Sequence, residues 1–285
     1  MKWLEPEVHP GWAWARIGWA VSALMTWIPR GTHITETYST DGILVSIGPV
    51  RLTELVMFSP GTAWTLYAVI LLSVTLVGLG RAPWLTRLGL VIAPLAILAM
   101  GFHEGLNFKA YDRLLCWEAM ALFVAPGAAS GRHEGSPAGR YMMTMIFMCL
   151  YASTGWMKIV KEPRWWGGLP LATDLVHRQF GMKPLGIWMS EQMWLLKPMS
   201  WTTLIFEAGW PLFILIRQAR PWLLLVGASF HIGVLALMDA NTFTFVALAA
   251  YPVLLPPAQF IWIRDAAARR ITAARGYMIG GDSPA

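Results

Sequence analysis

Long runs of apolar residues, separated by short stretches of proline, glycine and charged residues, dominate the chain. Several runs approach the ~20 apolar residues that a helix needs to cross about 30 Å of hydrocarbon. They predict eight spans, near residues 12–28, 62–80, 85–102, 110–128, 141–159, 200–217, 221–238 and 242–262. The first and fourth are the weakest, because they contain Arg16 and the Asp112-Arg113 pair.

The composition agrees with a membrane protein. Hydrophobic residues make up 56% of the 285 residues and charged residues 13%, and the mean hydropathy is +0.51. Helices satisfy their own backbone groups in lipid, so apolar runs of this length indicate helices. We therefore predict an all-α fold, a polytopic transmembrane helical bundle that forms a single domain over residues 1–285.

The arginines between the spans predict an orientation. With eight spans, the basic connections and the C-terminal tail fall on the same side as both termini: Arg81, Arg87, Arg132, Arg140, Arg217, Arg220, Arg264, Arg269, Arg270 and Arg275. Basic residues favour the cytoplasmic side. The N-terminus has no cleavable signal pattern. We expect an integral protein of the cell inner membrane with both termini in the cytoplasm and a frayed tail at 264–285.

The net charge, the tryptophans and the cysteines say little about a specific function. The net charge of +6 is spread over short loops, which indicates membrane orientation rather than nucleic-acid binding. Many of the 17 tryptophans stand near the ends of the apolar runs, where indoles settle at headgroup depth. Cys116 and Cys149 both lie in apolar runs and are predicted to be buried free thiols.

Two long connections, about 29–61 and 160–199, are expected on the non-cytoplasmic side. Loops of this length are usually functional or re-entrant. The second connection follows Lys158 and contains the segment KEPRWWGG. We therefore look for function at this side of the bundle.

Ionisable residues inside the apolar runs are the next signal. Glu118, Glu207 and His231 lie well inside their runs, and Lys158 lies at the non-cytoplasmic end of its run. Such groups tend to face the bundle interior and to pair. Arg16 and Lys158 are the natural counter-charges for Asp112, Glu118 or Glu207, but the sequence does not decide which pairs form. A buried pair can also simply fix the helix register.

Lys158 has two interpretations. A lysine at the centre of a spanning helix costs roughly 2.5–3.5 kcal/mol, so it either extends to headgroup phosphates or is kept there for chemistry. Desolvation makes an amine able to act as a general base near neutral pH. The spacing of histidines and acids contains no recognisable metal-binding motif.

A series of motifs then resembles the HTTM family, the membrane-domain superfamily that includes the vitamin K-dependent gamma-carboxylases. The resemblance runs over about 11–257 and is carried by Arg16, Tyr38 with Asp41-Gly42, Asn107 with Asp112 and Leu114-Leu115, Tyr151 with Gly155 and Lys158, Trp165 with Gly167, Glu207 with Pro211, Phe230-His231, and Phe243. The Tyr-x-x-x-Gly-x-x-Lys element followed by Trp-x-Gly is the most specific part.

The resemblance implies a non-cytoplasmic pocket in which Lys158 is the catalytic base and His231 a catalytic partner. In the carboxylases, the matching lysine is the base proposed to deprotonate vitamin K hydroquinone. The resemblance also implies that Trp165, Gly167, Glu207, Asp112 and Arg16 contribute to binding a cofactor, vitamin K hydroquinone or another quinol.

Two departures from the carboxylases limit what carries over. Those enzymes have a large soluble region after the membrane helices, and this sequence resembles a short member without it. Where they carry an important histidine before the fourth span, this chain has Asp112. We therefore do not expect carboxylation of protein glutamate.

Three hypotheses follow. The first is a quinone- or lipid-dependent redox or acid–base enzyme with Lys158 as base. The second is a non-catalytic subunit that packs within a larger membrane protein complex and binds lipid, quinone or pigment. The third, a transporter, ranks last because the sequence shows no internal repeat. The bilayer is the expected partner in each case, and nucleic acid in none.

Overall fold

The computed structural model describes residues 7–42, 58–103, 109–125, 134–135, 137–178, 181–239 and 241–279, and they form an all-α fold. The elements are β1 Glu7–Val8, α1 Gly11–Trp27, η2 Pro29–His33, α2 Ile34–Tyr38, α3 Pro60–Leu79, α4 Pro83–His103, α5 Ala110–Val124, β2 Glu134–Gly135, α7 Pro137–Lys161, η3 Pro163–Gly167, α8 Leu169–Leu175, α9 Pro184–Ser190, α10 Met193–Phe213, α11 Arg220–Leu237, α12 Asn241–Leu254 and α13 Pro257–Ile279. The two short strands pair antiparallel, Glu7 opposite Gly135.

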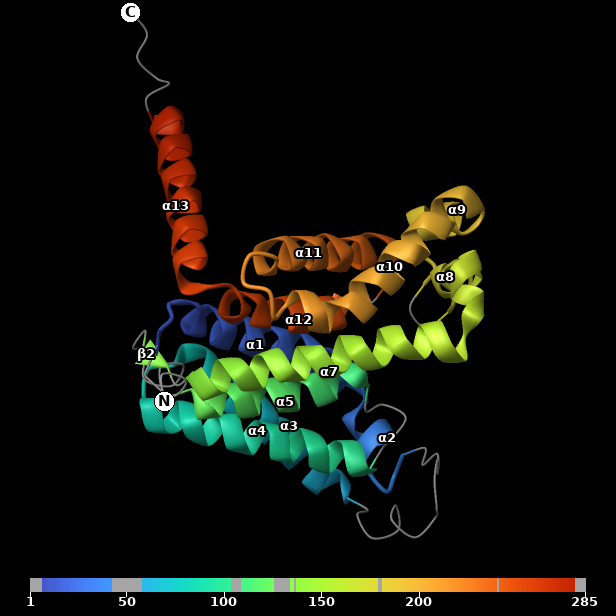
Figure 1. Cartoon of the computed structure of the whole chain (residues 1–285). Coiled ribbons are helices and arrows are strands. Elements are labelled where there is room, and N and C mark those ends of the chain that lie inside the picture. Colours follow the sequence, from blue (N-terminus) through green and yellow to red (C-terminus); the bar gives the residue numbers. More distant parts are fainter. Residues whose placement is uncertain are drawn as a thin grey trace, which may run out of the picture.

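The long helices lie side by side as one bundle (Figure 1). One end of the bundle carries α2, η3, α8 and α9, and we call it the loop end. The other end carries the β1–β2 pair and the turns from α3 to α4 and from α10 to α11, and we call it the basic end. Helix α13 leaves the bundle at the basic end and runs across the direction of the other helices (Figure 1).

Helix α1 is the central element of the bundle. It packs against α3 and α12, and the large rings of Trp12, Trp19 and Trp27 are almost fully buried. The Trp19 indole donates a hydrogen bond of 2.8 Å to the Leu115 carbonyl of α5. The opposite face of α1 carries exposed apolar side chains, among them Trp14, Val21 and Met25, so the helix is only partly enclosed by its neighbours.

Four of the expected spans are confirmed as helices long and apolar enough to cross a membrane, within the described part of the chain: α3, α4, α7 and α11. The expected spans 12–28, 110–128 and 200–217 correspond to helices α1, α5 and α10. These three do not reach the same length and hydropathy, since α1 and α5 have only 17 and 15 residues. Eight spans therefore remain a prediction.

The expected eighth span, 242–262, is wrong as a continuous helix. Helices α12 and α13 meet at an angle of 112°, so at most they form one broken span or a re-entrant turn. The break falls at Pro256-Pro257, and proline removes a helical hydrogen bond and clashes with the preceding turn. Residues 264–279, expected to be frayed, belong to α13, where alanine and arginine favour the helix.

The two cysteines differ. Cys116 is buried as expected, but Cys149 is exposed. Cys149 lies on the outer face of α7, because only one side of that helix packs against the bundle. An apolar position in a membrane helix faces lipid as readily as protein, so hydropathy alone could not tell these positions apart.

Candidate functional site

Lys158 and Glu207 form an ion pair between α7 and α10 at the loop end. The Lys158 Nζ lies 2.6 Å from each carboxylate oxygen of Glu207. Their side chains are only 23% and 6% exposed. Among the counter-charges that the sequence left open, Lys158 thus pairs with Glu207. The structure brings together two of the residues that the sequence singled out.

Gly155 allows this pairing. A Cβ atom at Gly155 would come within 2.5 Å of the Ala208 backbone nitrogen and within 2.8 Å of the Glu207 carbonyl carbon. Those atoms belong to the backbone of α10 and cannot move aside. The glycine of the Tyr-x-x-x-Gly-x-x-Lys element therefore lets α7 and α10 approach closely, one turn before Lys158.

Trp165 covers the ammonium group. The Lys158 Nζ lies 4.6 Å from the centre of the Trp165 ring, which attracts a cation. The ring is held by η3, since its indole donates to Glu162 at 3.2 Å and its carbonyl accepts a hydrogen bond from the Ser200 hydroxyl of α10. The lysine is therefore enclosed by a carboxylate and an indole.

The two glycines after the tryptophans have different roles. A Cβ atom at Gly167 would contact nothing within 4 Å, so the structure gives no packing reason for this glycine. Gly168 has a φ of +81° and lies against the backbone of Leu196 and Lys197. The backbone therefore requires glycine at Gly168, the residue that follows the expected Trp-x-Gly element.

Asp174 is a site residue that the sequence reasoning missed. It lies in α8, and its charge interacts with those of Lys158, Glu162 and His177. Burial raises the pKa of Asp174 above its ordinary value, whereas Lys158 lowers it. The sequence contains only a weak signal for Asp174, because it is a single aspartate in the long connection 160–199. The residues around it depend on how α8 packs against α10.

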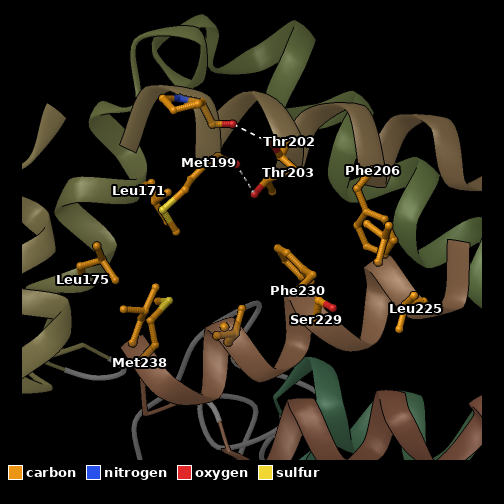
Figure 2. Close-up of a pocket in the computed structure, with 15 residues that line it drawn as sticks. Leu171, Leu175, Met199, Thr202, Thr203, Phe206, Leu225, Ser229, Phe230 and Met238 are labelled. Atoms are coloured by element: carbon orange, nitrogen blue, oxygen red, sulfur yellow. Dashed lines mark hydrogen bonds between the residues drawn. The ribbon is translucent and has the colours of Figure 1, made fainter. Parts of the chain in front are cut away.

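A groove of about 520 Å³ opens between α8, α10 and α11 (Figure 2). Its wall is almost wholly apolar, with Leu175, Phe206 and Phe230 among its lining residues. The hydroxyls of Thr202 and Thr203 are turned to backbone carbonyls of their own helix (Figure 2). Leu175 and Phe206, the sequence neighbours of Asp174 and Glu207, line the groove, so the groove and the charged cluster share helices α8 and α10. Lys158, Glu207 and Asp174 themselves are not among its lining residues.

His231 lies deeper in the bundle. It is fully buried, and its Nε2 is 2.6 Å from the hydroxyl of Tyr151, which also lies 3.4 Å from the Tyr251 hydroxyl. Tyr151 precedes Lys158 by seven residues on α7, about 10.5 Å along the helix. His231 and Lys158 are therefore in neighbouring clusters, and Phe206, whose ring packs on Tyr151, stands between the histidine cluster and the groove.

Three buried polar atoms in this region have no hydrogen-bond partner in the described part of the chain: Glu118 Oε1, Trp210 Nε1 and His231 Nδ1. Glu118 and Glu207 both interact electrostatically with the Tyr151 hydroxyl, and the Trp210 ring centre is 5.2 Å from that of Tyr151. Such unpaired atoms usually mark water or a bound group. Glu118, expected to pair with a cation, instead borders this interior cluster.

Asp112, predicted to bind a cofactor, is fully buried in an ion pair with Arg30. Two nitrogens of the Arg30 guanidinium each lie 2.9 Å from a carboxylate oxygen, and Asp112 also accepts the backbone N–H of Lys109. Arg30 lies over the Trp27 ring at 4.4 Å. This pair ties the end of α1 to the start of α5. Arg30, missed from the sequence, stands in a loop where its partner was not evident.

Arg16 lies toward the basic end, away from these groups. Its guanidinium donates to the carbonyls of Val77 and Gly78, the latter at 2.8 Å. The last carbonyls of a helix lack partners within the helix and carry partial negative charge. Arg16 therefore caps α3 instead of pairing with an acid. Of the remaining motif residues, Asn107 lies outside the described residues.

No group of three or more His, Cys, Asp or Glu side chains in the described ranges could hold a metal ion. In the comparison with known proteins, residues 132–258 match the family model of the HTTM domain. That stretch contains Lys158, Glu207, His231 and the groove, but not Arg16, Arg30 or Asp112. No curated protein matches the chain, and no solved structure matches it.

Proposed function

From the premise that residues 132–258 of this chain form an HTTM domain, we propose that it is a membrane-embedded acid–base enzyme for a lipid-soluble substrate. The observation that carries the proposal is the Lys158–Glu207 pair, which Trp165 encloses and whose glutamate stands on α10, a helix that also lines an apolar groove. A few convergent polar groups in a largely apolar cavity are the usual composition of a binding or active site.

The pair can take a proton from a substrate hydroxyl at the end of the groove. Lys158 first passes its own proton to Glu207, and the neutral amine then takes the proton from the substrate hydroxyl. The substrate anion that forms then lies beside a positive charge in a site with little water, where such stabilisation is strong. The Trp165 ring favours the protonated lysine, which is the state that follows proton transfer. Lys158 therefore acts as the base within a two-residue unit.

The groove favours an apolar molecule with one acidic hydroxyl, and a quinol fits this description. The substrate enters sideways from the membrane between α8, α10 and α11, and its hydroxyl points to the border formed by Asp174 and Glu207. His231 and Tyr151 act from behind Phe206, by keeping the interior side of the site polar. Arg16 and Asp112 hold helices together outside the matched domain.

Reconstitution in liposomes tests the proposal. Oxygen uptake driven by an added quinol should be measurable with the wild-type chain and lost with Lys158→Ala. Lys158→Arg should also lose it, because a guanidinium stays protonated. Arg164→Gln, which removes an exposed cation of the same loop, is the matched control and should retain activity. Turnover that persists in Lys158→Ala would refute the assignment.

A second candidate is a non-catalytic subunit of a larger membrane complex. The observation that favours it is the number of strongly exposed aromatic side chains: Trp84, Trp156, Trp188, Trp194, Trp222 and Trp262 are all more than half exposed. Purification in mild detergent distinguishes the two. Fixed co-purification with other subunits, together with no quinol-dependent turnover, supports this candidate and counts against the enzyme.

A further inference from the structure

Helix α13 stands apart from the bundle. After the 112° bend that follows α12, it runs across the direction of the other helices at the basic end (Figure 1). Its first turn is held by the bundle, where the ring centres of Phe260 and His9 are 6.3 Å apart. None of the main helix–helix contacts in the described part of the chain involves α13. Because helices in proteins owe most of their stability to the packing of one face, we expect α13 to rest on a surface outside the bundle.

Exposed tryptophans at the basic end mark the depth of the membrane interface. Trp84 near the start of α4, Trp222 near the start of α11 and Trp262 in α13 are 66%, 70% and 68% exposed. Helices α4 and α11 are two of the candidate membrane spans, and both begin at this end. Indoles settle at headgroup depth. A helix that crosses the bundle direction at this level therefore lies in the plane of the interface.

The charge of α13 is strongly positive. Between Pro257 and Ile279 the helix contains four arginines and one aspartate. The aspartate, Asp265, pairs with its neighbour Arg264, and one turn further on Arg269 and Arg270 are both exposed. The connections at the same end add three further exposed arginines: Arg81, Arg87 and Arg217. Anionic phospholipid headgroups have the complementary charge, and they attract basic segments that lie next to a membrane span.

We propose that α13 binds the anionic phospholipid headgroups of the basic-end leaflet. Arg269 and Arg270 contact the headgroup phosphates, and the exposed apolar side chains of the first two turns, Ile261 to Ile263, reach the acyl-chain boundary. This surface is at the opposite end of the bundle from Lys158 and does not rest on the proposed enzymatic function. An acidic partner protein and a second copy of the chain are the competing occupants.

A spin label on α13 provides the assay. In the full chain, Cys149→Ser removes the exposed cysteine, and Ala268→Cys places a label at an exposed position of α13. Nanodiscs that hold one copy of the chain are made from palmitoyl-oleoyl phosphatidylcholine, either alone or mixed with the phosphatidylglycerol of the same chains. Phosphatidylglycerol should increase the immobilised fraction of the label and lower its accessibility to a neutral aqueous relaxation agent.

Two pairs of substitutions sharpen the test. Arg269→Gln with Arg270→Gln should lower the ratio of immobilised to mobile label about 25-fold in the phosphatidylglycerol discs, at about fivefold for each basic residue near an anionic surface. Lysine at both positions should keep the ratio, because the contact depends on charge. The matched control removes two exposed cations of the loop end, Arg164→Gln with Arg178→Gln, and should leave the ratio unchanged.

The fold of each variant is checked at the buried Cys116, which should stay unmodified by N-ethylmaleimide. Equal immobilisation in the two kinds of disc would overturn the proposal, as would immobilisation that survives Arg269→Gln with Arg270→Gln. Immobilisation that requires more than one copy in a disc would identify a second copy as the occupant. Immobilisation that is absent from both kinds of disc and present in native membrane vesicles would identify a partner protein instead.

Discussion

The loop end of the molecule holds two ion pairs that look alike but differ in what they can do. In each, a cation from one element meets a carboxylate from another and lies over a tryptophan ring, Arg30 over Trp27 and Lys158 over Trp165. The Asp112 carboxylate is fully buried and also accepts a backbone N–H. The Lys158 side chain is 23% exposed.

The chemistry of the two cations explains the difference. A guanidinium does not lose its proton in a protein, whereas an amine can. The Arg30–Asp112 pair is therefore a fixed link between η2 and α5, whereas the proposed function requires the Lys158–Glu207 pair to exchange a proton. Burial and charge alone would have ranked Asp112 above Glu207 as a site residue. Proton exchange and access to a groove are the better criteria.

The largest predicted effect is the loss of stability in Asp112→Asn. The substitution removes the carboxylate that pairs with the largely buried Arg30, and breaking a buried pair in this way costs about 3–5 kcal/mol. The free energy of unfolding, measured in mixed micelles with a denaturing detergent, should fall by this amount. Glu162→Gln, which breaks an exposed pair with Arg164, should cost about 0–1 kcal/mol. Equal losses in the two variants would contradict a structural role for Asp112.

Replacing each cation by the other type, Arg30→Lys and Lys158→Arg, tests the difference between the two ion pairs. Arg30→Lys keeps the charge but gives up one of the two hydrogen bonds to Asp112 and the flat contact on Trp27, at a cost of about 1.5–3 kcal/mol. Lys158→Arg keeps the charge near Glu207 and should change the same unfolding free energy by less than about 1 kcal/mol, while removing the proton exchange. A larger loss of unfolding free energy in Lys158→Arg than in Arg30→Lys would show that the Lys158–Glu207 pair is the structural link.

A smaller effect is expected from the spacing of α7 and α10. Gly155→Ala places a methyl group against the backbone of Glu207 and Ala208, and overpacking of this kind costs about 1–3 kcal/mol. It should also move Lys158 relative to Glu207, and so reduce any quinol-dependent turnover. Gly167→Ala is the control, because its Cβ would contact nothing within 4 Å. Normal stability and turnover in Gly155→Ala would mean that close helix approach is not required.

The sequence predicted the helical elements well and their partners poorly. The long apolar runs located α3, α4, α7 and α11, because a helix that faces lipid must be apolar along most of its length. It overestimated the span at 242–262, where Pro256-Pro257 turn the chain by 112°. For the site, Lys158, Trp165 and Glu207 were identified and lie together. Arg30 and Asp174 were missed, since both stand in connections whose neighbours are set by tertiary packing.

The smallest predicted effect concerns Asp174, the acid that faces Lys158, Glu162 and His177. Burial raises its pKa above the ordinary 3.8, although Lys158 and His177 act in the opposite direction. The folded state thus binds this proton more tightly than the unfolded chain does, so the contribution of Asp174 to stability is largest below its ordinary pKa. That contribution is lost as the pH rises from about 4 through the raised pKa.

Asp174→Asn should flatten this part of the curve of unfolding free energy against pH. Lys158→Ala should extend the loss to higher pH, because the positive charge that lowers the pKa of Asp174 is gone. The Arg30–Asp112 pair offers the contrast, since Arg30→Gln should leave this Asp174-dependent step in place. If the pH-dependent step persists in Asp174→Asn, another acid at the loop end causes it. Asp174 would then not be the acid whose protonation stabilises the fold in this pH range.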